Sequence, residues 1–304
     1  MARAADRGVR RVSTRLRAVQ KGRLAALGSA ASFAAIPPLA RIAYDAGATP
    51  GTIVLARLGF GAAAAVAVVS LLNRPWRIPR GEWTGTLAVA VAWMLVTVGY
   101  MASFYYIPVS LAVLIFFTFP VQIAVVAPLV ERRPPDRITL GGALIAFTGL
   151  LLALGPDLGV LDWRGCALAF TAAIGAMATF ILSQRLVVEQ DMFSFSFHLH
   201  LACLAIIGVA LPGVGVPSVP ANAWGWAAVI AVGVFYVMAT LLQFGAIRLA
   251  GPARASMVCN AEPVITMIAA AVILGERLGP WQVTGAALVI GAVVLSARAD
   301  QPES

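Results

Sequence analysis

The sequence predicts an all-α polytopic membrane protein with about ten transmembrane helices arranged as two inverted five-helix repeats. Hydrophobic residues make up 61% of the 304 residues and charged residues only 12%, whereas soluble domains average roughly 45–50% and about 25%. A chain this apolar could not cover a water-facing surface with polar groups, so lipid is its expected solvent. The number of long apolar segments and a repeated sequence pattern then give the helix count and the arrangement.

Ten segments have the length and polarity of membrane spans. A transmembrane helix needs about 20 mainly apolar residues. The expected spans are 24–43, 52–72, 84–106, 109–130, 138–155, 165–184, 195–213, 225–248, 253–274 and 282–298. The fifth and tenth are short for full spans. Turn-forming joints such as Ala48-Thr49-Pro50-Gly51 separate the spans, and no joint is long enough for a soluble domain.

The distribution of Lys and Arg predicts that both termini are cytoplasmic. Eight of the 22 basic residues lie in the first 23 positions. With the N-terminus inside, the cytoplasmic segments carry 18 basic residues and the opposite side carries four, which is the usual bias of membrane proteins. The net charge of +9 therefore reflects membrane orientation, and no nucleic-acid partner is expected.

Two stretches of the chain repeat the same landmarks. IPVSLAVLIFFTFPVQIAVVAPLVERRPP at 107–135 resembles AGPARASMVCNAEPVITMIAAAVILGERLGP at 250–280. Each has a proline inside the span, Pro120 in one and Pro263 in the other, and each span ends in a Glu-Arg pair. A proline removes a backbone donor and frees a carbonyl one turn earlier, so both prolines are expected to kink their helices.

These landmarks divide the chain into two halves. The expected units are a basic cytoplasmic tail at 1–23, a first five-helix repeat at 24–155, a second at 156–298 and a C-terminal tail at 299–304. Because five is odd, the second half must enter the membrane in the opposite direction to the first. Inverted repeats are a transporter architecture that binds substrate near the bilayer midplane between the halves.

The chain resembles the drug/metabolite transporter superfamily and, within it, the ten-helix EamA-type permeases. The resemblance covers about 24–298 and is most specific in YIPVSLAVLIFFTFPV and AEPVITMIAAAVILGERL, with Ala56-Arg57-Leu58 as a further recurrent position. It implies a cavity between two inverted bundles, alternating access, and often export of amino acids or related metabolites. The first repeat departs from the pattern, since LVERRPP follows its proline two residues earlier than LGERLGP does.

Polar residues inside the spans are the candidate substrate contacts. They are Tyr100, Gln122, Tyr236, Gln243, Asn260 and Glu262. Hydrogen bonding between helices is the alternative role for the uncharged ones. Glu262 is expected to carry a proton or bind a substrate amine, or else to be the structural partner of Arg57 or Arg254. Arg57 is expected to reach the interface or to bind a substrate carboxylate.

No catalytic or cofactor site is expected. Cys166, Cys203 and Cys259 are widely spaced, and no set of residues has metal-ligand, nucleotide-loop or nucleophile-elbow spacing. The best reading is a transporter in a bacterial inner membrane, with a small-molecule substrate, the bilayer and protons as partners. A lipid-modifying membrane enzyme and a non-transporting scaffold are the alternatives, and a homodimer stays open.

The charge count predicts a topology that reporter fusions can test. Fusions after residues 80, 160, 218 and 304 should report inside, outside, outside and inside, because basic segments stay in the cytoplasm. An outside signal at residue 80 or 304 would contradict this topology.

Overall fold

The computed structural model describes residues 2–103, 106–107, 109–134, 136–155, 162–189, 191–214, 217–274 and 279–298. The regular elements within these ranges are helices: α1 (Ala2–Asp45), α2 (Pro50–Leu71), η1 (Arg80–Glu82), α3 (Trp83–Ser103), α4 (Val109–Phe116), α5 (Phe119–Val130), α6 (Arg137–Leu154), α7 (Trp163–Glu189), α8 (Met192–Val214), α9 (Ala223–Ala250), α10 (Pro252–Cys259), α11 (Ala261–Leu274) and α12 (Pro280–Arg298). The expected C-terminal tail and the second Glu-Arg pair, Glu276-Arg277, lie outside the described residues.

Eight helical segments in the described part of the chain are long and apolar enough to cross a membrane, which makes this an all-α integral membrane protein. They are Arg17–Asp45, Pro50–Leu71, Arg80–Tyr100, Leu111–Val130, Arg137–Leu154, Trp163–Glu189, Met192–Val209 and Ala223–Ala250. The expected ninth span is divided into α10 and α11. The expected tenth corresponds to α12, whose apolar part, Pro280–Leu295, is shorter.

Two helix breaks fall at equivalent places in the chain. The helix α4 ends at Phe116 and α5 begins at Phe119, while α10 ends at Cys259 and α11 begins at Ala261. Phe116 and Cys259 each lie four residues before a proline, Pro120 and Pro263. A proline has no N–H for the carbonyl at that position and its ring clashes with that carbonyl, so each helix ends there.

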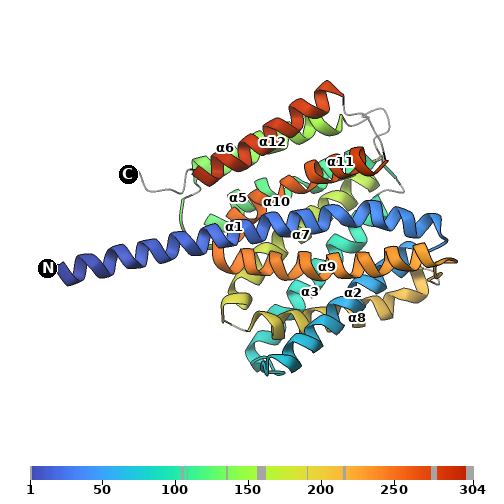
Figure 1. The fold of residues 1–304 in the computed structure, drawn as a ribbon, viewed down its shortest axis with the longest axis horizontal. Coiled ribbons are helices and arrows are strands. Elements are labelled where there is room, and N and C mark those ends of the chain that lie inside the picture. Colours follow the sequence, from blue (N-terminus) through green and yellow to red (C-terminus); the bar gives the residue numbers. More distant parts are fainter. Residues whose placement is uncertain are drawn as a thin grey trace.

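Long helices from distant parts of the chain pack in pairs. The helix α1 lies along α9, α3 along α7, α2 along α8, and α6 along α12. In Figure 1, α6 and α12 occupy one side of the molecule, α1 and α9 cross its middle, and α2 and α8 lie on the opposite side. The core consists mainly of Ala, Val, Ile, Leu and Phe side chains on the inward faces of these helices.

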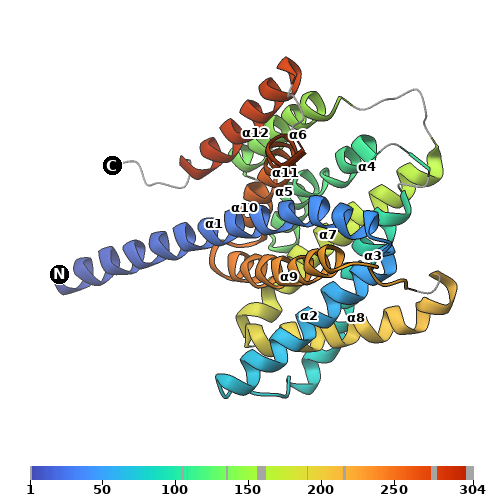
Figure 2. The same ribbon diagram turned by 45° about the vertical axis from the view of Figure 1, so that its right-hand side comes forward.

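The helix α1 is 44 residues long and includes the basic N-terminal segment. Its first turns project beyond the bundle, and α12 finishes at the same end of the molecule (Figure 2). The basic segment is therefore continuous with a helix of the bundle.

Polar contacts tie α2 and α8 together at both ends. At one end the Thr52 hydroxyl donates to the carbonyl of Ser218, and the Ser218 hydroxyl donates to the carbonyl of Gly47 at 2.6 Å. At the other end the Ser194 hydroxyl donates to the carbonyl of Pro75, and Arg74 pairs with Asp191 at 3.5 Å. The loops that flank this antiparallel pair are thus held to each other.

The packing of α6 on α12 predicts a sharp steric effect at Gly149. A Cβ atom there would lie 2.7 Å from the Gly285 carbonyl oxygen and 2.9 Å from the Val289 nitrogen, whereas a Cβ atom at Gly141 meets nothing within 4 Å. Overpacking costs about 1–3 kcal/mol. Gly149→Leu should therefore lower the melting temperature in detergent by several degrees. Gly141→Leu, the matched control on the same helix, should leave it unchanged. Equal effects of both substitutions would contradict this packing.

Candidate cavity between the helix pairs

A cavity of about 170 Å³ lies among the central helices. Helices from both halves of the chain line it. The lining residues are Phe33, Ile36, Pro37, Arg57, Trp93, Val96, Thr97, Tyr100, Phe116, Phe119, Ala176, Thr179, Phe180, Gln243, Cys259 and Glu262. Most of these walls are apolar, as in small-molecule sites generally, with a few polar groups to fix orientation.

Opposite charges face this cavity. Arg57 comes from α2, and Glu262 comes from the first turn of α11, directly after the second helix break. An acid in the first turn of a helix is favoured by the helix dipole. Charged side chains inside a membrane protein are costly and normally face a cavity or a partner. The arrangement can accept one negative and one positive group of a small solute.

Uncharged polar groups supplement this pair. Tyr100 and Thr97 come from α3, Thr179 from α7 and Gln243 from α9. The Thr97 hydroxyl donates a hydrogen bond to the carbonyl of Trp93 at 3.0 Å. Gln243 is 6% exposed and offers an amide with both donor and acceptor atoms.

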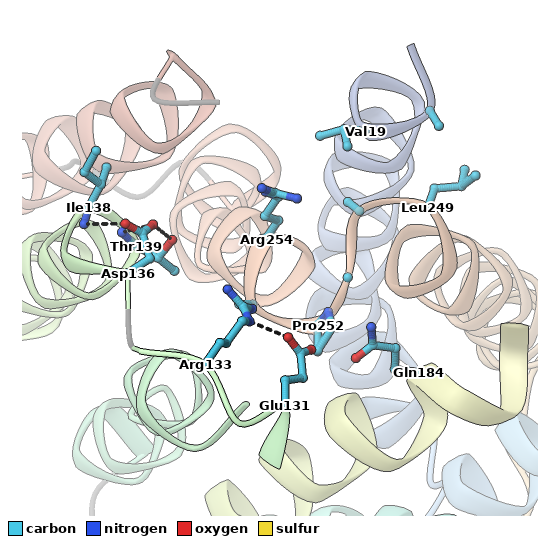
Figure 3. Close-up of a pocket in the computed structure, with 14 residues that line it drawn as sticks. Val19, Glu131, Arg133, Asp136, Ile138, Thr139, Gln184, Leu249, Pro252 and Arg254 are labelled. Atoms are coloured by element: carbon cyan, nitrogen blue, oxygen red, sulfur yellow. Dashed lines mark hydrogen bonds and ion pairs between the residues drawn. The ribbon is translucent and has the colours of Figure 1, made fainter. Parts of the chain in front are cut away.

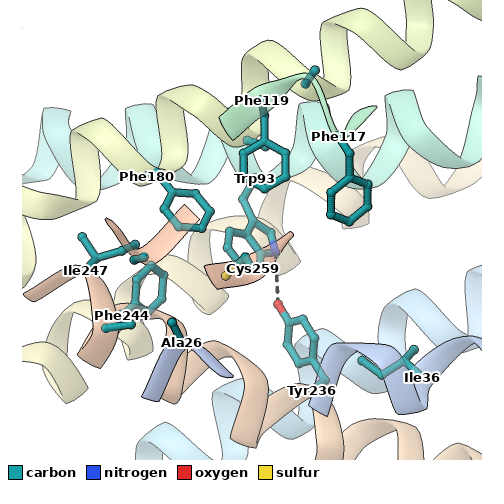
Figure 4. Packing of buried hydrophobic residues seen from close by; sticks show 14 of the residues in the cluster. Ala26, Ile36, Trp93, Phe117, Phe119, Phe180, Tyr236, Phe244, Ile247 and Cys259 are labelled. Atoms are coloured by element: carbon teal, nitrogen blue, oxygen red, sulfur yellow. Dashed lines mark hydrogen bonds between the residues drawn. The ribbon is translucent and has the colours of Figure 1, made fainter. Parts of the chain in front are cut away.

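Aromatic rings form a continuous wall of the cavity. Phe116, at the end of α4, lies 4.7 Å from Tyr100 and 5.3 Å from Phe119 between ring centroids. Phe119 stacks on Phe180 of α7 at 5.5 Å. Figure 4 labels Phe119, Phe180 and Trp93, and all three line the cavity. The break between α4 and α5 thus places two phenylalanines against the cavity.

Tyr236 lies beneath Arg57 and is absent from the cavity lining. Its side chain is 1% exposed, and the Arg57 guanidinium carbon sits 4.7 Å from the centre of its ring. The Trp93 indole N–H donates to the Tyr236 hydroxyl at 3.1 Å, as Figure 4 shows. Tyr236 is therefore a support for a cavity residue, and its expected contact with substrate stays a prediction.

Gln122 and Asn260 lie beside the helix breaks, outside the cavity lining. Gln122 donates from its amide to the Thr118 hydroxyl at 3.1 Å, and the Asn260 backbone N–H donates to the Met257 carbonyl. The oxygen of the Gln122 amide and the nitrogen of the Asn260 amide are buried and have no hydrogen-bond partner among the residues that the structure describes. Both residues lie close to the broken backbone, and their expected contact with substrate also stays a prediction.

A second, larger pocket of about 630 Å³ lies at the end of the bundle where α5 and α9 finish. Glu131 pairs there with Arg133, and Arg254 of α10 projects toward the same space (Figure 3). Asp136 caps α6. Hydrogen bonds from the Thr139 hydroxyl and from the backbone amides of Thr139 and Ile138 hold the pKa of the Asp136 carboxyl below its usual value.

Sequence reasoning identified part of the cavity. Tyr100, Gln243 and Glu262 line it, and their expected contact with substrate stays a prediction. Arg57 also lines it, and its expected binding of a substrate carboxylate stays a prediction. The phenylalanines were not singled out. For Phe116 and Phe119 the available signal was their position four residues before Pro120 and directly beside it, whereas Phe33 and Phe180 carry no such signal.

Comparisons with known proteins agree with this architecture. The model of the EamA-like transporter family matches residues 20–155 and again 163–298. The threonine/homoserine exporter RhtA of Escherichia coli, in strain K12 and in O157:H7, is 27% identical over 279 residues, covering 88% of each chain. One solved crystal structure superposes with a TM-score of 0.76 at 18% identity, covering 92% of this chain and 97% of the other. That likeness shows the fold alone.

The cavity predicts which engineered cysteines react with a water-soluble thiol reagent. With Cys166, Cys203 and Cys259 replaced by alanine, Tyr100→Cys and Gln243→Cys should be labelled, and transported solute should protect them. Thr240→Cys, on the same helix as Gln243 but outside the cavity lining, is the control and should stay unlabelled. If neither cavity position reacts in any condition, the cavity is not open to water and its assignment is wrong.

Proposed function

The chain belongs to the EamA-like transporter family, and from this premise we propose that it exports amino acids or closely related metabolites across a bacterial inner membrane by alternating access. The observation that carries the proposal is a central cavity with Arg57 on one wall, Glu262 on another and aromatic rings between. The RhtA exporters, which are similar over most of both chains, support amino acids such as threonine and homoserine as the solutes to test first.

Arg57 and Glu262 divide the recognition of an amino acid between them. The guanidinium of Arg57 presents parallel N–H donors that match a carboxylate. Glu262 in its ionised form accepts hydrogen bonds from an ammonium group. A zwitterion satisfies both residues at once, whereas a solute with one charge leaves the other residue buried without a partner. Tyr100 and Gln243 then bind uncharged polar atoms of the solute.

The proposed architecture has ten spans in two inverted repeats, 24–155 and 156–298, with the basic segment 1–23 in the cytoplasm. The two ranges matched by the family model support this division. In this arrangement α4 with α5 and α10 with α11 are the fourth and ninth spans, each broken before its proline. A broken helix in the membrane requires a cavity or protein around its free backbone groups, so both breaks belong at the substrate site.

Glycine contacts support the two-fold relation between the repeats. Gly22 packs against Ala250, where an added Cβ atom would lie 2.8 Å from the alanine Cβ. Gly165 packs against Ile107 with the same 2.8 Å approach. Gly165 follows Gly22 by 143 positions, and Ala250 follows Ile107 by the same 143. A contact that recurs with its partners exchanged is what a two-fold axis produces.

The contacts at the two ends of α2 and α8 support the same relation. Ser218 follows Pro75 by 143 positions, and each offers its carbonyl to a hydroxyl on the other helix of the pair. The basic-residue count assigns the Arg74 end to the cytoplasm and the Ser218 end to the outside. In this proposal α2 and α8 remain joined while the broken helices move to open the cavity to each side in turn.

Glu262 is the proposed carrier of a coupling proton, because it is the one carboxylate among the cavity-lining residues. Gln122 and Asn260, which have unpartnered atoms at the breaks, are proposed to meet the solute as the breaks rearrange.

Efflux measurements test this function. Vesicles that contain the protein should release labelled L-threonine or L-homoserine faster than empty vesicles, and a proton gradient should accelerate the release. Glu262→Gln should abolish the gradient-driven part, because the amide cannot exchange a proton. The same change at the exposed Glu189, which pairs with Arg185, should leave it intact.

The outcomes separate two claims. Unaltered efflux in Glu262→Gln would remove this residue from the mechanism. Failure of the protein to release any amino acid would contradict the function itself.

A further inference from the structure

Arg57 is a half-buried cation in the wall of the cavity. No acidic group in the described ranges lies within ion-pair distance of it. Its long side chain has many rotamers, so something other than an ion pair must hold the guanidinium in the cavity. The contact that the structure provides is the face of the Tyr236 ring, 4.7 Å from the guanidinium carbon. A cation over an aromatic face is attracted by the negative charge of that face.

The Tyr236 ring is itself fixed from several directions. The indole N–H of Trp93 donates to its hydroxyl at 3.1 Å. The ring of Phe33 meets it edge-on at 6.4 Å, and the imidazole of His200 does so at 5.7 Å. The ring is 1% exposed, so it has little room to rotate or to leave the contact with Arg57.

This support is built from both halves of the chain. Tyr236 follows Trp93 by 143 positions, the same interval that separates Pro120 from Pro263. The Trp93–Tyr236 hydrogen bond therefore joins equivalent residues of the proposed repeats, one on α3 and the other on α9. His200 likewise follows Arg57 by 143 positions. The equivalents differ in placement, since Arg57 lines the cavity while the His200 ring is buried against Gly61.

From this geometry we infer that Tyr236, held by Trp93, is a positioning residue that keeps the Arg57 guanidinium aimed into the cavity for a solute carboxylate. The inference rests on the proposed function, because it concerns how that site recognises its solute. Tyr236 touches no solute in this assignment. It acts only through Arg57, and because its hydrogen bond spans the two halves, the position of Arg57 depends on how those halves are arranged.

Binding of L-threonine and of L-threonine amide to the purified protein tests the inference, because the amide has no carboxylate. Tyr236→Leu removes the aromatic face and should raise the Kd for threonine by about tenfold while changing the Kd for the amide little. Tyr236→Phe keeps the face and loses only the hydrogen bond, so it should cause a smaller rise. Trp93→Phe removes the same hydrogen bond and also changes the cavity wall, so it should lower the preference for threonine over its amide at least as much as Tyr236→Phe.

The control for a general packing defect is Phe195→Leu, which removes a buried ring that packs against Phe244 and makes no ring contact with Tyr236 among the described residues. It should leave the ratio of the two Kd values unchanged. Arg57→Gln is the reference, and it should remove most of the preference for threonine over its amide.

The outcomes distinguish the inference from the proposed function. If Arg57→Gln removes the preference but Tyr236→Leu and Tyr236→Phe weaken both solutes equally, Tyr236 is only structural and the inference is wrong. If Arg57→Gln leaves the preference intact, Arg57 does not bind the carboxylate, and both the proposed site and the inference fail. Should Tyr236→Leu not reach the membrane, Tyr236→Phe and Trp93→Phe decide, and an unchanged ratio in both overturns the inference.

Discussion

Backbone N–H and C=O groups inside hydrocarbon have no water to bind, so each must find a partner within the protein or beside a cavity. In the described part of this chain the requirement is met by long helices, and the two interruptions at α4/α5 and α10/α11 occur among other helices. Phe116, Phe119, Cys259 and Glu262, which flank the interruptions, all line the same cavity. Because a helix break cannot face lipid, the side chains that flank these two breaks lie in the interior of the protein.

Close approach of helices is the second requirement, because lipid supplies no hydrophobic force to press helices together. Glycines at the contacts of α1 with α9, α3 with α7 and α6 with α12 allow backbone atoms to come near each other. Gly175, for example, brings α7 to the Ala92 carbonyl of α3, where an added Cβ atom would lie at 2.7 Å. This packing fixes the rotation of each helix about its axis and hence which side chains reach the cavity.

The two charged residues that line the cavity are stabilised by different surroundings. Glu262 stands at the start of a helix, where the dipole favours an acid, and Arg57 stands on an aromatic ring. Neither has an ion-pair partner within 4.0 Å among the described residues. Hydroxyl groups within the helices also find partners inside the protein. The Thr97 and Thr240 hydroxyls, for instance, donate to carbonyls four residues earlier.

The sequence by itself determined the helical membrane class and most of the apolar helices long enough to span a membrane. Apolar length requires a helix across lipid. Pro120 and Pro263 each follow a helix break, whereas Pro37, Pro38 and Pro128 lie inside continuous helices. Depth along a helix follows from residue number, which is why Tyr100, Gln243 and Glu262 could be assigned to the cavity. Rotation about the helix axis does not follow from residue number. It depends on which small residues let neighbouring helices approach, and only the tertiary structure decided that Arg57 faces the cavity, that Tyr236 lies beneath it, and that Gln122 and Asn260 stay beside the breaks.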